Sequence, residues 1–564
     1  MKFIKSKILL LAAVGFLSSC EKEAFVDINK NPDALTEIPP QNQFLQATNS
    51  IHSQDFEAYY DNYRRIMPWM QYNTPQTGNQ GSFTQNYSNF ANRYGRLYNG
   101  IGDRLYDVEQ LVAKLDAAEQ PRYDQMIQIS RILRAYYAFY VSDIYGSIPY
   151  AEAFQGRYGG TLQPKYDTQQ ELFARLDSEI KAAVTALKAT PAGAQNSLGN
   201  YDQYYKGDPL KWIKAANALR LRMALRVQKA DAAAGNAIIT DVLAQPATDL
   251  MSSNADAWVF IGNATFTGPA DGGNWNTEGL RAPKPMVDFM WTKMDPRLDV
   301  FFTPNQYSQA NIDLLIADKK LPAGTKEGRR YIGSFTSPDD ARLTVNVQKY
   351  YTPKLITSNK QTVDTLSFIQ PRLFNTGRAD AAGNAGTGQS YLPVITYAEY
   401  CFMRAEIAVK TTGAAAAKTW YEAGVKSSLD WYNEVGQKSQ LTNYTPMTAA
   451  EITTYMAQPD IAFNPAKAMD QIGSQSYLNF MKQPQEGWAL YKRTGYPNAT
   501  TVVPLPRVTY LNVPLTVPRR APITLPAQSD PNYANKKAAY DAMAALPGFG
   551  DLTSAAGRVW WDKP

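Results

Sequence analysis

Three long segments of the chain repeat apolar residues with the 3.6-residue period of an α-helix. They are 123–141, 172–187 and 212–227, and no run of alternating apolar and polar residues separates them. In 123–141 the apolar residues recur at positions 126/127, 129, 132/133, 136/137 and 140, which is the spacing of one helix face. Helices without intervening strands bury their apolar faces on one another, so these segments predict an all-α scaffold.

The segment 212–227 is apolar around most of its circumference and still contains three arginines. We expect Arg220, Arg222 and Arg226 to face solvent or to form ion pairs. Farther along, 395–410 and 414–435 have helical spacing and are separated by a glycine-containing turn. Their combined length is close to the roughly 34 residues of a tetratricopeptide-type hairpin, although any pair of antiparallel helices would share this pattern.

The chain contains one histidine and two cysteines, Cys20 and Cys401. Zinc sites with several histidines and two-histidine iron sites are therefore excluded, and a histidine-dependent nucleophile would have to use His52. A helical pattern begins at Phe44 and is predicted to continue through Met67. His52 lies in a polar part of it, so we expect a solvated side chain. Cys401 lies in an apolar pattern and is expected to be buried.

The first twenty residues have the pattern of a bacterial lipoprotein leader. Three lysines precede the apolar run 8–17, which is too short to cross a bilayer of roughly 30 Å as a helix. The sequence Leu-Ser-Ser-Cys that ends at Cys20 resembles a lipobox, which implies cleavage before Cys20 and lipid attachment to it. We expect 1–19 to be a lipoprotein signal peptide and 20–43 a lipidated tether. The alternative is a secreted protein whose cysteine lies near the cleavage point by coincidence.

The charge of the chain is close to balanced. The net charge is +6 and falls to +3 without the three lysines of the leader. This charge does not favour a nucleic-acid partner. No spacing typical of an EF-hand occurs, so we expect no metal site and no cofactor.

Two segments combine aromatic residues with glycine and amide side chains: 68–87 and 254–310. Aromatic rings can stack on sugar faces while asparagine and glutamine bond the hydroxyls; alternatively, some rings fold back and anchor the loops. A third segment, 332–373, is threonine-rich and partly β-like. The candidate ligand-binding residues are Phe83, Asn86 and Tyr87 in the first segment and Trp258, Asn274 and Trp275 in the second, with Trp69 and Tyr72 as reserves.

Several motifs follow one another in a fixed order behind Cys20. They are DINKNP (27–32), YGSIPYAEAF (145–154), KWIKAANALRLRMALR (211–226), ITYAEYCFMRAEIAVK (395–410), EGWALYKRTGYP (486–497) and VWWD (559–562). This order resembles the SusD/RagB family of nutrient-binding outer-membrane lipoproteins, particularly its SusD-like branch. The resemblance spans nearly the whole mature chain.

The resemblance implies one helical domain, 44–564, of tetratricopeptide-like helix pairs with long inserted loops and little β-structure. It also implies a lipid-anchored outer-membrane protein, not an enzyme, that faces the cell exterior, binds nutrients such as oligosaccharides and delivers them to a SusC-like TonB-dependent transporter. A RagB-like peptide binder and a helical-repeat adaptor are the alternatives. A glycoside hydrolase would need two carboxylates about 5 to 9.5 Å apart in a cleft, and no motif supports one. None of the motifs contains a known ligand residue of the family, so none is transferred.

Overall fold

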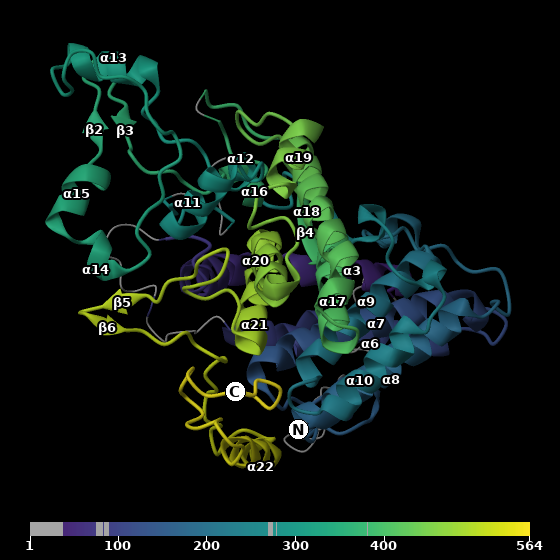
Figure 1. Cartoon of the computed structure of the whole chain (residues 1–564). Helices are drawn as coiled ribbons and strands as arrows, with labels where there is room; N and C mark the ends of the chain where they lie inside the picture. Colours follow the sequence, from purple (N-terminus) through teal and green to yellow (C-terminus); the bar gives the residue numbers. More distant parts are fainter. Residues whose placement is uncertain (1–37, 75–82, 84–89, 269–274, 278, 381) are drawn as a thin grey trace, which may run out of the picture.

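The computed structural model describes residues 38–74, 83, 90–268, 275–277, 279–380 and 382–564. In these residues the chain forms packed helices with three small two-stranded sheets (Figure 1). The predicted all-α scaffold is therefore confirmed. The predicted signal peptide, Cys20 and most of the predicted tether lie outside the described residues.

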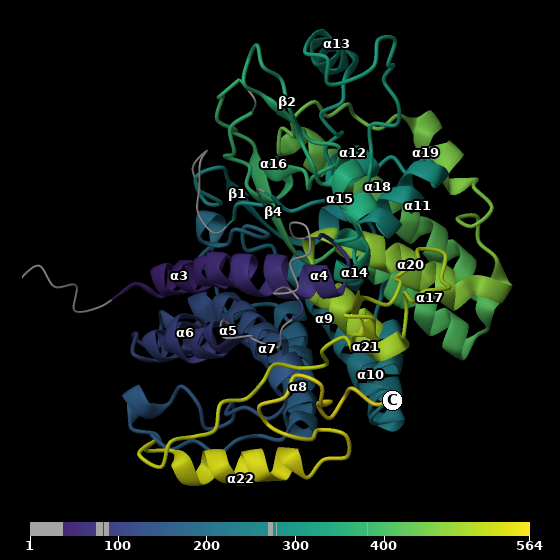
Figure 2. The same ribbon diagram turned by 90° about the vertical axis from the view of Figure 1, so that its left-hand side faces the viewer.

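The expectation of one continuous helix from Phe44 to Met67 is wrong. The helix α3 ends at His52, and beyond Ser53 and Gln54 the chain turns into a π-helix, η1. A π-helix bonds residue i to i+5 and is rare, but it is frequent at functional sites. In Figure 2, α3 runs above α6, on which it packs. The elements of this part are α3 Pro40–His52, η1 Glu57–Ile66, α4 Met67–Trp69, α5 Phe90–Arg96, η3 Leu97–Ile101 and α6 Gly102–Ala113.

The next four helices include the three strongest patterns of the sequence, and each packs on its neighbour along the chain. Thr168 and Glu171 form a capping box at the start of α8, which fixes where this helix begins. The carboxylate of Asp208 accepts two backbone N–H groups at the start of α9 and has the same effect there. The helices are α7 Asp124–Tyr145, α8 Gln169–Lys188, α9 Pro209–Val227 and α10 Ala232–Leu243.

The predicted helical hairpin 395–435 is also present. Its helices, α17 and α18, pack along each other, and Cys401 is fully buried in α17, as expected. Thr396 caps α17 by accepting the backbone N–H of Glu399. The helices of this half are α17 Tyr397–Thr411, α18 Lys418–Lys438, α19 Ala449–Met456, α20 Ala468–Asn479 and α21 Pro484–Thr494.

A strand pair joins the two helical halves. The strand β1 (Trp258–Asn263) runs antiparallel to β4 (Gln389–Ile395), with Trp258 opposite Ile395. The first part of the predicted loop 254–310 is therefore a strand. Between these strands the chain forms a lobe at the upper left of Figure 1, in which only β2 and β3 match the β-like expectation for 332–373. Its elements are α11 Lys284–Lys293, α12 Leu298–Phe301, α13 Gln309–Ala317, α14 Pro338–Ala341, α15 Thr344–Tyr350, β2 Lys354–Leu355, β3 Thr362–Val363 and α16 Pro371–Phe374.

The C-terminal segment returns to the N-terminal helices, and its helix α22 lies across the base of the molecule in Figure 2. This segment comprises β5 Thr509–Tyr510, β6 Val513–Pro514 and α22 Tyr533–Ala544. Single 3₁₀ turns complete the connections: η4 Gln120–Tyr123, η5 Gly156–Tyr158, η6 Gly199–Tyr201, η7 Ala247–Asp249, η8 Asn254–Asp256, η9 Ala414–Ala417, η10 Pro465–Lys467 and η11 Phe480–Lys482.

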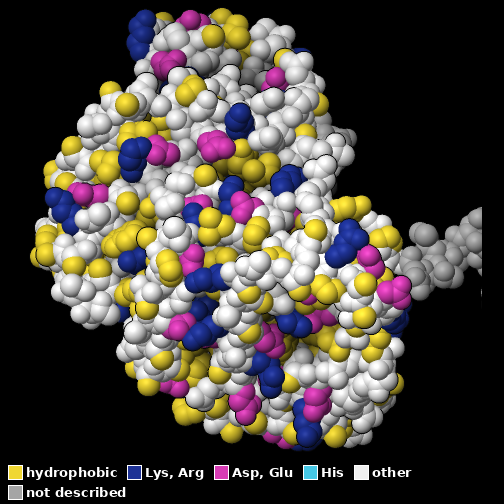
Figure 3. Space-filling view, turned by 90° about the vertical axis from the view of Figure 1, so that its right-hand side faces the viewer, with side chains coloured by type: hydrophobic (Ala, Val, Ile, Leu, Met, Phe, Trp, Pro, Cys, Tyr) yellow, Lys and Arg dark blue, Asp and Glu magenta, His cyan; other side chains and the backbone are white. Residues whose placement is uncertain are grey.

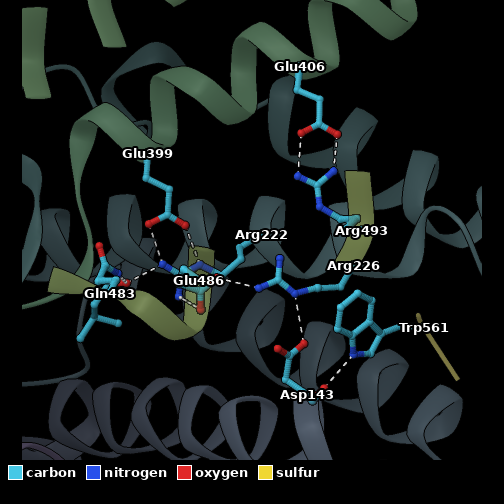
Figure 4. A network of polar contacts seen from close by, with 10 residues as sticks. Asp143, Arg222, Arg226, Glu399, Glu406, Gln483, Glu486, Arg493 and Trp561 are labelled. Carbon is cyan, nitrogen blue, oxygen red and sulfur yellow. Dashed lines mark hydrogen bonds and ion pairs between the residues drawn. The ribbon is translucent and has the colours of Figure 1, made fainter. Parts of the chain in front are cut away.

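A buried ionic network ties α9 to helices from distant parts of the sequence (Figure 4). Two nitrogens of Arg222 each lie 2.7 Å from an oxygen of Glu399 on α17. Arg226 binds Asp143 of α7 at 3.1 Å and Glu486 of α21 at 2.6 Å. Of the two expectations for these arginines, ion pairing is confirmed and exposure is excluded, because both side chains are almost fully buried.

Arg220 is buried as well, and it pairs with Asp177 at 2.7 Å and Asp241 at 2.8 Å. A separate bidentate pair joins Glu406 of α17 to Arg493 of α21. Burial alone would raise the pKa of Glu406, but the positive charges of Arg493 and Lys410 outweigh it and lower the pKa to about 2. These ion pairs link α7, α8, α9, α10, α17 and α21 to one another.

The surface shows the balanced charge that the sequence implies. On the face seen in Figure 3, lysine and arginine side chains are interspersed with aspartate and glutamate, and no broad region of one sign appears there. This face offers no footprint for a polyanion such as nucleic acid.

Candidate ligand-binding site

An open cleft of about 110 Å³ lies where α3, η1, α7, β4 and the start of α21 meet. A single water needs roughly 10–15 Å³, so the cleft has room for a ring-sized group. Its walls combine aromatic rings with amide side chains, those of Gln54, Asn62 and Gln485. The aromatic residues are Tyr63, Tyr136, Tyr137, Tyr140, Trp275 and Phe374.

The π-helix η1 supplies one wall of the cleft. Its residues Glu57, Asn62 and Tyr63 all line the cavity. The Tyr63 ring meets Phe374 edge to face at 5.4 Å, and its hydroxyl donates to the backbone carbonyl of Trp275 at 3.5 Å. Tyr63 therefore links η1 to the segment that contains Trp275.

The carboxylate of Glu57, in the wall formed by η1, is neutralised by an ion pair. Glu57 forms an ion pair with Arg93 at 2.5 Å and also accepts the hydroxyl of Tyr140. The Arg93 guanidinium stacks on the Tyr140 ring, 3.9 Å from its centroid. Next to this pair, Asp61 is buried, and burial together with the charge of Glu57 raises its pKa to about 8. Asp61 is therefore mostly protonated at neutral pH.

The expectation that His52 is solvated is wrong. Its ring stacks on Phe260 at 4.6 Å, and its Nε2 lies 2.7 Å from the hydroxyl of Tyr204. Burial lowers the pKa of His52 to about 3, so the ring is neutral at the edge of the cleft. The polar residues next to His52 in the sequence do not indicate these contacts, because Tyr204 and Phe260 are more than 150 residues away along the chain.

Lys482 is a half-buried lysine in the opposite wall. Its ammonium group donates to the carbonyl of Leu373 and lies 4.9 Å from the centroid of the Phe374 ring. Burial lowers the pKa of Lys482 to about 7. Nothing in the sequence distinguishes Lys482 from the many lysines that occur at helix ends, so it could not be predicted as a site residue.

Trp275 is the one predicted ligand-binding residue that the structure places in the cleft, and it is half-buried there. Phe83 lies elsewhere, with its ring edge to face against Trp69 at 5.0 Å. Asn86, Tyr87 and Asn274 lie outside the described residues.

Three of the predicted residues are interior side chains. Trp69 is 5% exposed, and Tyr72 and Trp258 are fully buried. Tyr72 stacks on Tyr477 at 4.5 Å, and Trp258 packs against Trp212 at 5.2 Å. These side chains are buried, so they offer no exposed ring face on which a sugar could stack in this structure. The polar composition of a loop does not show which of its rings turn inward.

A second, larger groove contains an exposed tryptophan that was not predicted from the sequence. Trp291 of α11 is 44% exposed, and the groove beside it has a volume of about 550 Å³. The guanidinium of Arg329 lies over the indole, 5.2 Å from the ring centroid. Met294, Asp299 and Glu451 are among the other residues that line this groove. Trp291 has helical spacing in the sequence and was indistinguishable from a core residue.

The part of the chain that the structure describes contains no group of three or more histidine, cysteine, aspartate or glutamate residues that could hold a metal ion. Among the same residues, no helix has the length and apolar character needed to span a membrane.

A family model described as "Starch-binding associating with outer membrane" matches residues 32–505, which is most of the chain. The chain belongs to the SusD-like family. No curated protein matches this SusD-like chain by sequence.

Solved structures that resemble this SusD-like protein cover almost all of it. A chitin-binding protein is 21% identical over 93% of this chain and 100% of its own, with a TM-score of 0.70. A Bacteroidetes SusD-like protein is 20% identical over the same shares, with a TM-score of 0.66. A chitin-binding SusD homologue from Flavobacterium johnsoniae is 20% identical over 93% of this chain and 97% of its own, with a TM-score of 0.56. At these identities the likeness shows that the fold is shared.

Proposed function

We propose that this SusD-like protein binds oligosaccharides and that the cleft beside Trp275 is where a sugar ring enters. The proposal depends on one observation: Trp275 lies in an open cleft together with the side chains of Tyr63, Asn62 and Gln54. An indole can stack on the apolar face of a sugar, while amide groups donate to and accept from its hydroxyls. The starch-binding description of the family and the chitin-binding neighbours support the same ligand class.

Binding in this cleft is expected to be passive and reversible. Glu57 is the single carboxylate among its described lining residues, and Arg93 and Tyr140 already occupy it. Hydrolysis of a glycoside would normally require two carboxylates at the scissile bond, so this set of residues supports binding without cleavage. Affinity in the micromolar to millimolar range, about 4 to 8 kcal/mol, would allow the ligand to be released again.

The location and the partner are the further parts of the proposal. The leader and Cys20 support a lipid anchor, and the family description associates such proteins with the outer membrane. A protein held at the cell exterior in this way would pass its ligand to a SusC-like TonB-dependent transporter. Co-purification of a β-barrel transporter with the tagged protein from detergent-solubilised outer membranes would support this partner.

The binding proposal is tested by affinity electrophoresis in gels that contain starch or soluble chitin, followed by calorimetry with the matching oligosaccharides. Trp275→Ala should weaken binding about 10-fold or more through loss of ring stacking, with an unchanged melting temperature. Trp291→Ala is the matched control, since it removes an exposed tryptophan outside the cleft. If Trp291→Ala weakens binding and Trp275→Ala does not, the site lies in the other groove.

Analysis of the incubated polysaccharide separates the remaining alternatives. Binding without release of shorter products supports the proposal, and product release would show an enzyme. If no glycan is retained but peptides bind, the protein is a peptide binder of the RagB-like kind.

A further inference from the structure

The cleft is lined by a half-buried lysine, Lys482, that no carboxylate neutralises. Within the described residues, the contacts of the Lys482 ammonium group are the carbonyl of Leu373 and the ring of Phe374. No described aspartate or glutamate lies within ion-pairing distance of it. Buried charges in proteins are normally paired, because an unpaired ion loses its hydration without compensation. The lowered pKa of Lys482 has this cause.

The other titratable groups around the cleft do not supply the missing negative charge. Glu57 is paired with Arg93, and the raised pKa of Asp61 keeps this carboxyl mostly protonated at neutral pH. His52 is neutral because of its lowered pKa. The charge of Lys482 is therefore not balanced by the groups on η1, α3 or α7, and an anion in the cleft would balance it.

Two more polar atoms in the cleft wall have no partner. The hydroxyl of Tyr137 and the amide oxygen of Asn62 are buried and make no hydrogen bond within the described part of the chain. Tyr137 is 1% exposed. Its hydroxyl can donate to an acidic group, and Asn62 can accept from a sugar hydroxyl. Buried polar atoms without a hydrogen bond are uncommon in proteins. A ligand that forms hydrogen bonds with these two atoms would account for them.

We propose that the cleft selects an acidic sugar, with the carboxylate of a uronic acid residue bound by Lys482. The proposal rests on the proposed oligosaccharide binding and specifies its ligand class. In this arrangement Trp275 contacts the ring face, Lys482 and Tyr137 donate to the carboxylate, and Asn62 accepts a hydroxyl. A neutral sugar would leave Lys482 unpaired, so the preference for the acid follows from the charge of the cleft.

The test uses two ligands with the same sugar backbone: trigalacturonic acid, which carries carboxylates, and its methyl ester, which carries neutral ester groups in their place. By calorimetry at pH 6.5, wild-type protein should bind the free acid about 10- to 100-fold more tightly, as expected for a hydrogen bond between charged groups. Lys482→Met should remove this preference, whereas Lys438→Met, at an exposed lysine at the end of α18, should retain it. The melting temperature of each variant checks its folding, and the comparison of ligands on the wild-type protein needs no variant.

The outcomes separate this inference from the proposed function. Equal binding of acid and ester overturns the preference for acid and leaves oligosaccharide binding intact. If neither ligand binds but starch or chitin oligosaccharides do, the preference for acid is again overturned and oligosaccharide binding stands. If no glycan of any kind binds, both proposals fail.

Discussion

Arg222 and Glu399 form a bidentate ion pair in the interior, with 2.7 Å between the atoms of each of its two N–O contacts. The two residues are 177 positions apart in the sequence, and the pair joins α9 to α17. Both side chains are 3% exposed. Removal of Arg222 would leave Glu399 without its ion-pair partner in the interior.

We therefore expect Arg222→Ala to lower the free energy of unfolding by about 3–5 kcal/mol. Urea unfolding followed by tryptophan fluorescence measures this change. Arg122→Ala is the matched control, because Arg122 forms an ion pair with Glu119 in which both side chains are nearly half exposed. Its loss should cost less than about 1 kcal/mol. Similar small effects of both changes would contradict a stabilising role for the network.

The pKa of His52 predicts a dependence of stability on pH. Its pKa is about 3 in the folded protein and about 6.5 in the unfolded chain, so the unfolded chain takes up a proton that the folded protein excludes. The contribution of His52 to stability is present above pH 6.5 and decreases as the pH falls toward 3. Between pH 6.5 and 5.5 the expected decrease is about 1 kcal/mol.

The variant His52→Asn isolates this contribution. Asp61 has the opposite dependence, because its pKa is raised, so the wild-type curve alone is a mixture. The difference in unfolding free energy between wild type and variant should change by about 1 kcal/mol over this pH interval, and it reports His52, the single histidine of the chain. A difference that does not vary with pH would mean that the His52 ring is accessible to protons.

The predicted lipid anchor is tested by Cys20→Ser. Without the thiol no lipid can be attached, and the precursor should no longer incorporate labelled palmitate. Globomycin should likewise block processing of the wild-type precursor before Cys20. Fractionation and labelling of cells that express each form measure both effects. Labelling that persists in Cys20→Ser would contradict the lipobox interpretation.

The sequence allowed the helical scaffold to be predicted because helical periodicity is local. The patterns of α7, α8, α9, α17 and α18 are each contained in about twenty residues, and the structure confirms all of them. The break between α3 and η1 could not be predicted in this way, since Phe44 to Met67 has one uninterrupted helical pattern.

The site was harder to predict because the burial of a ring depends on distant partners. Trp258 is buried since β1 pairs with β4, which lies more than 120 residues farther along the chain. Trp275 belongs to the same glycine-rich segment in the sequence and lines the cleft. Lys482 and Tyr63 could not be recognised as site residues from the sequence, because a lysine at a helix end and a tyrosine in a helical pattern are common features.

The ionic network has a kinetic consequence. Arg226 meets Glu486 across 260 positions of sequence, and Arg222 meets Glu399 across 177. Contacts between such distant residues are associated with slow folding, because a long loop must close before the contact stabilises anything. The centre of the molecule therefore stays open until α17 and α21 have been synthesised. Until then Glu399 and Glu486, the distant partners of Arg222 and Arg226, are missing from the interior.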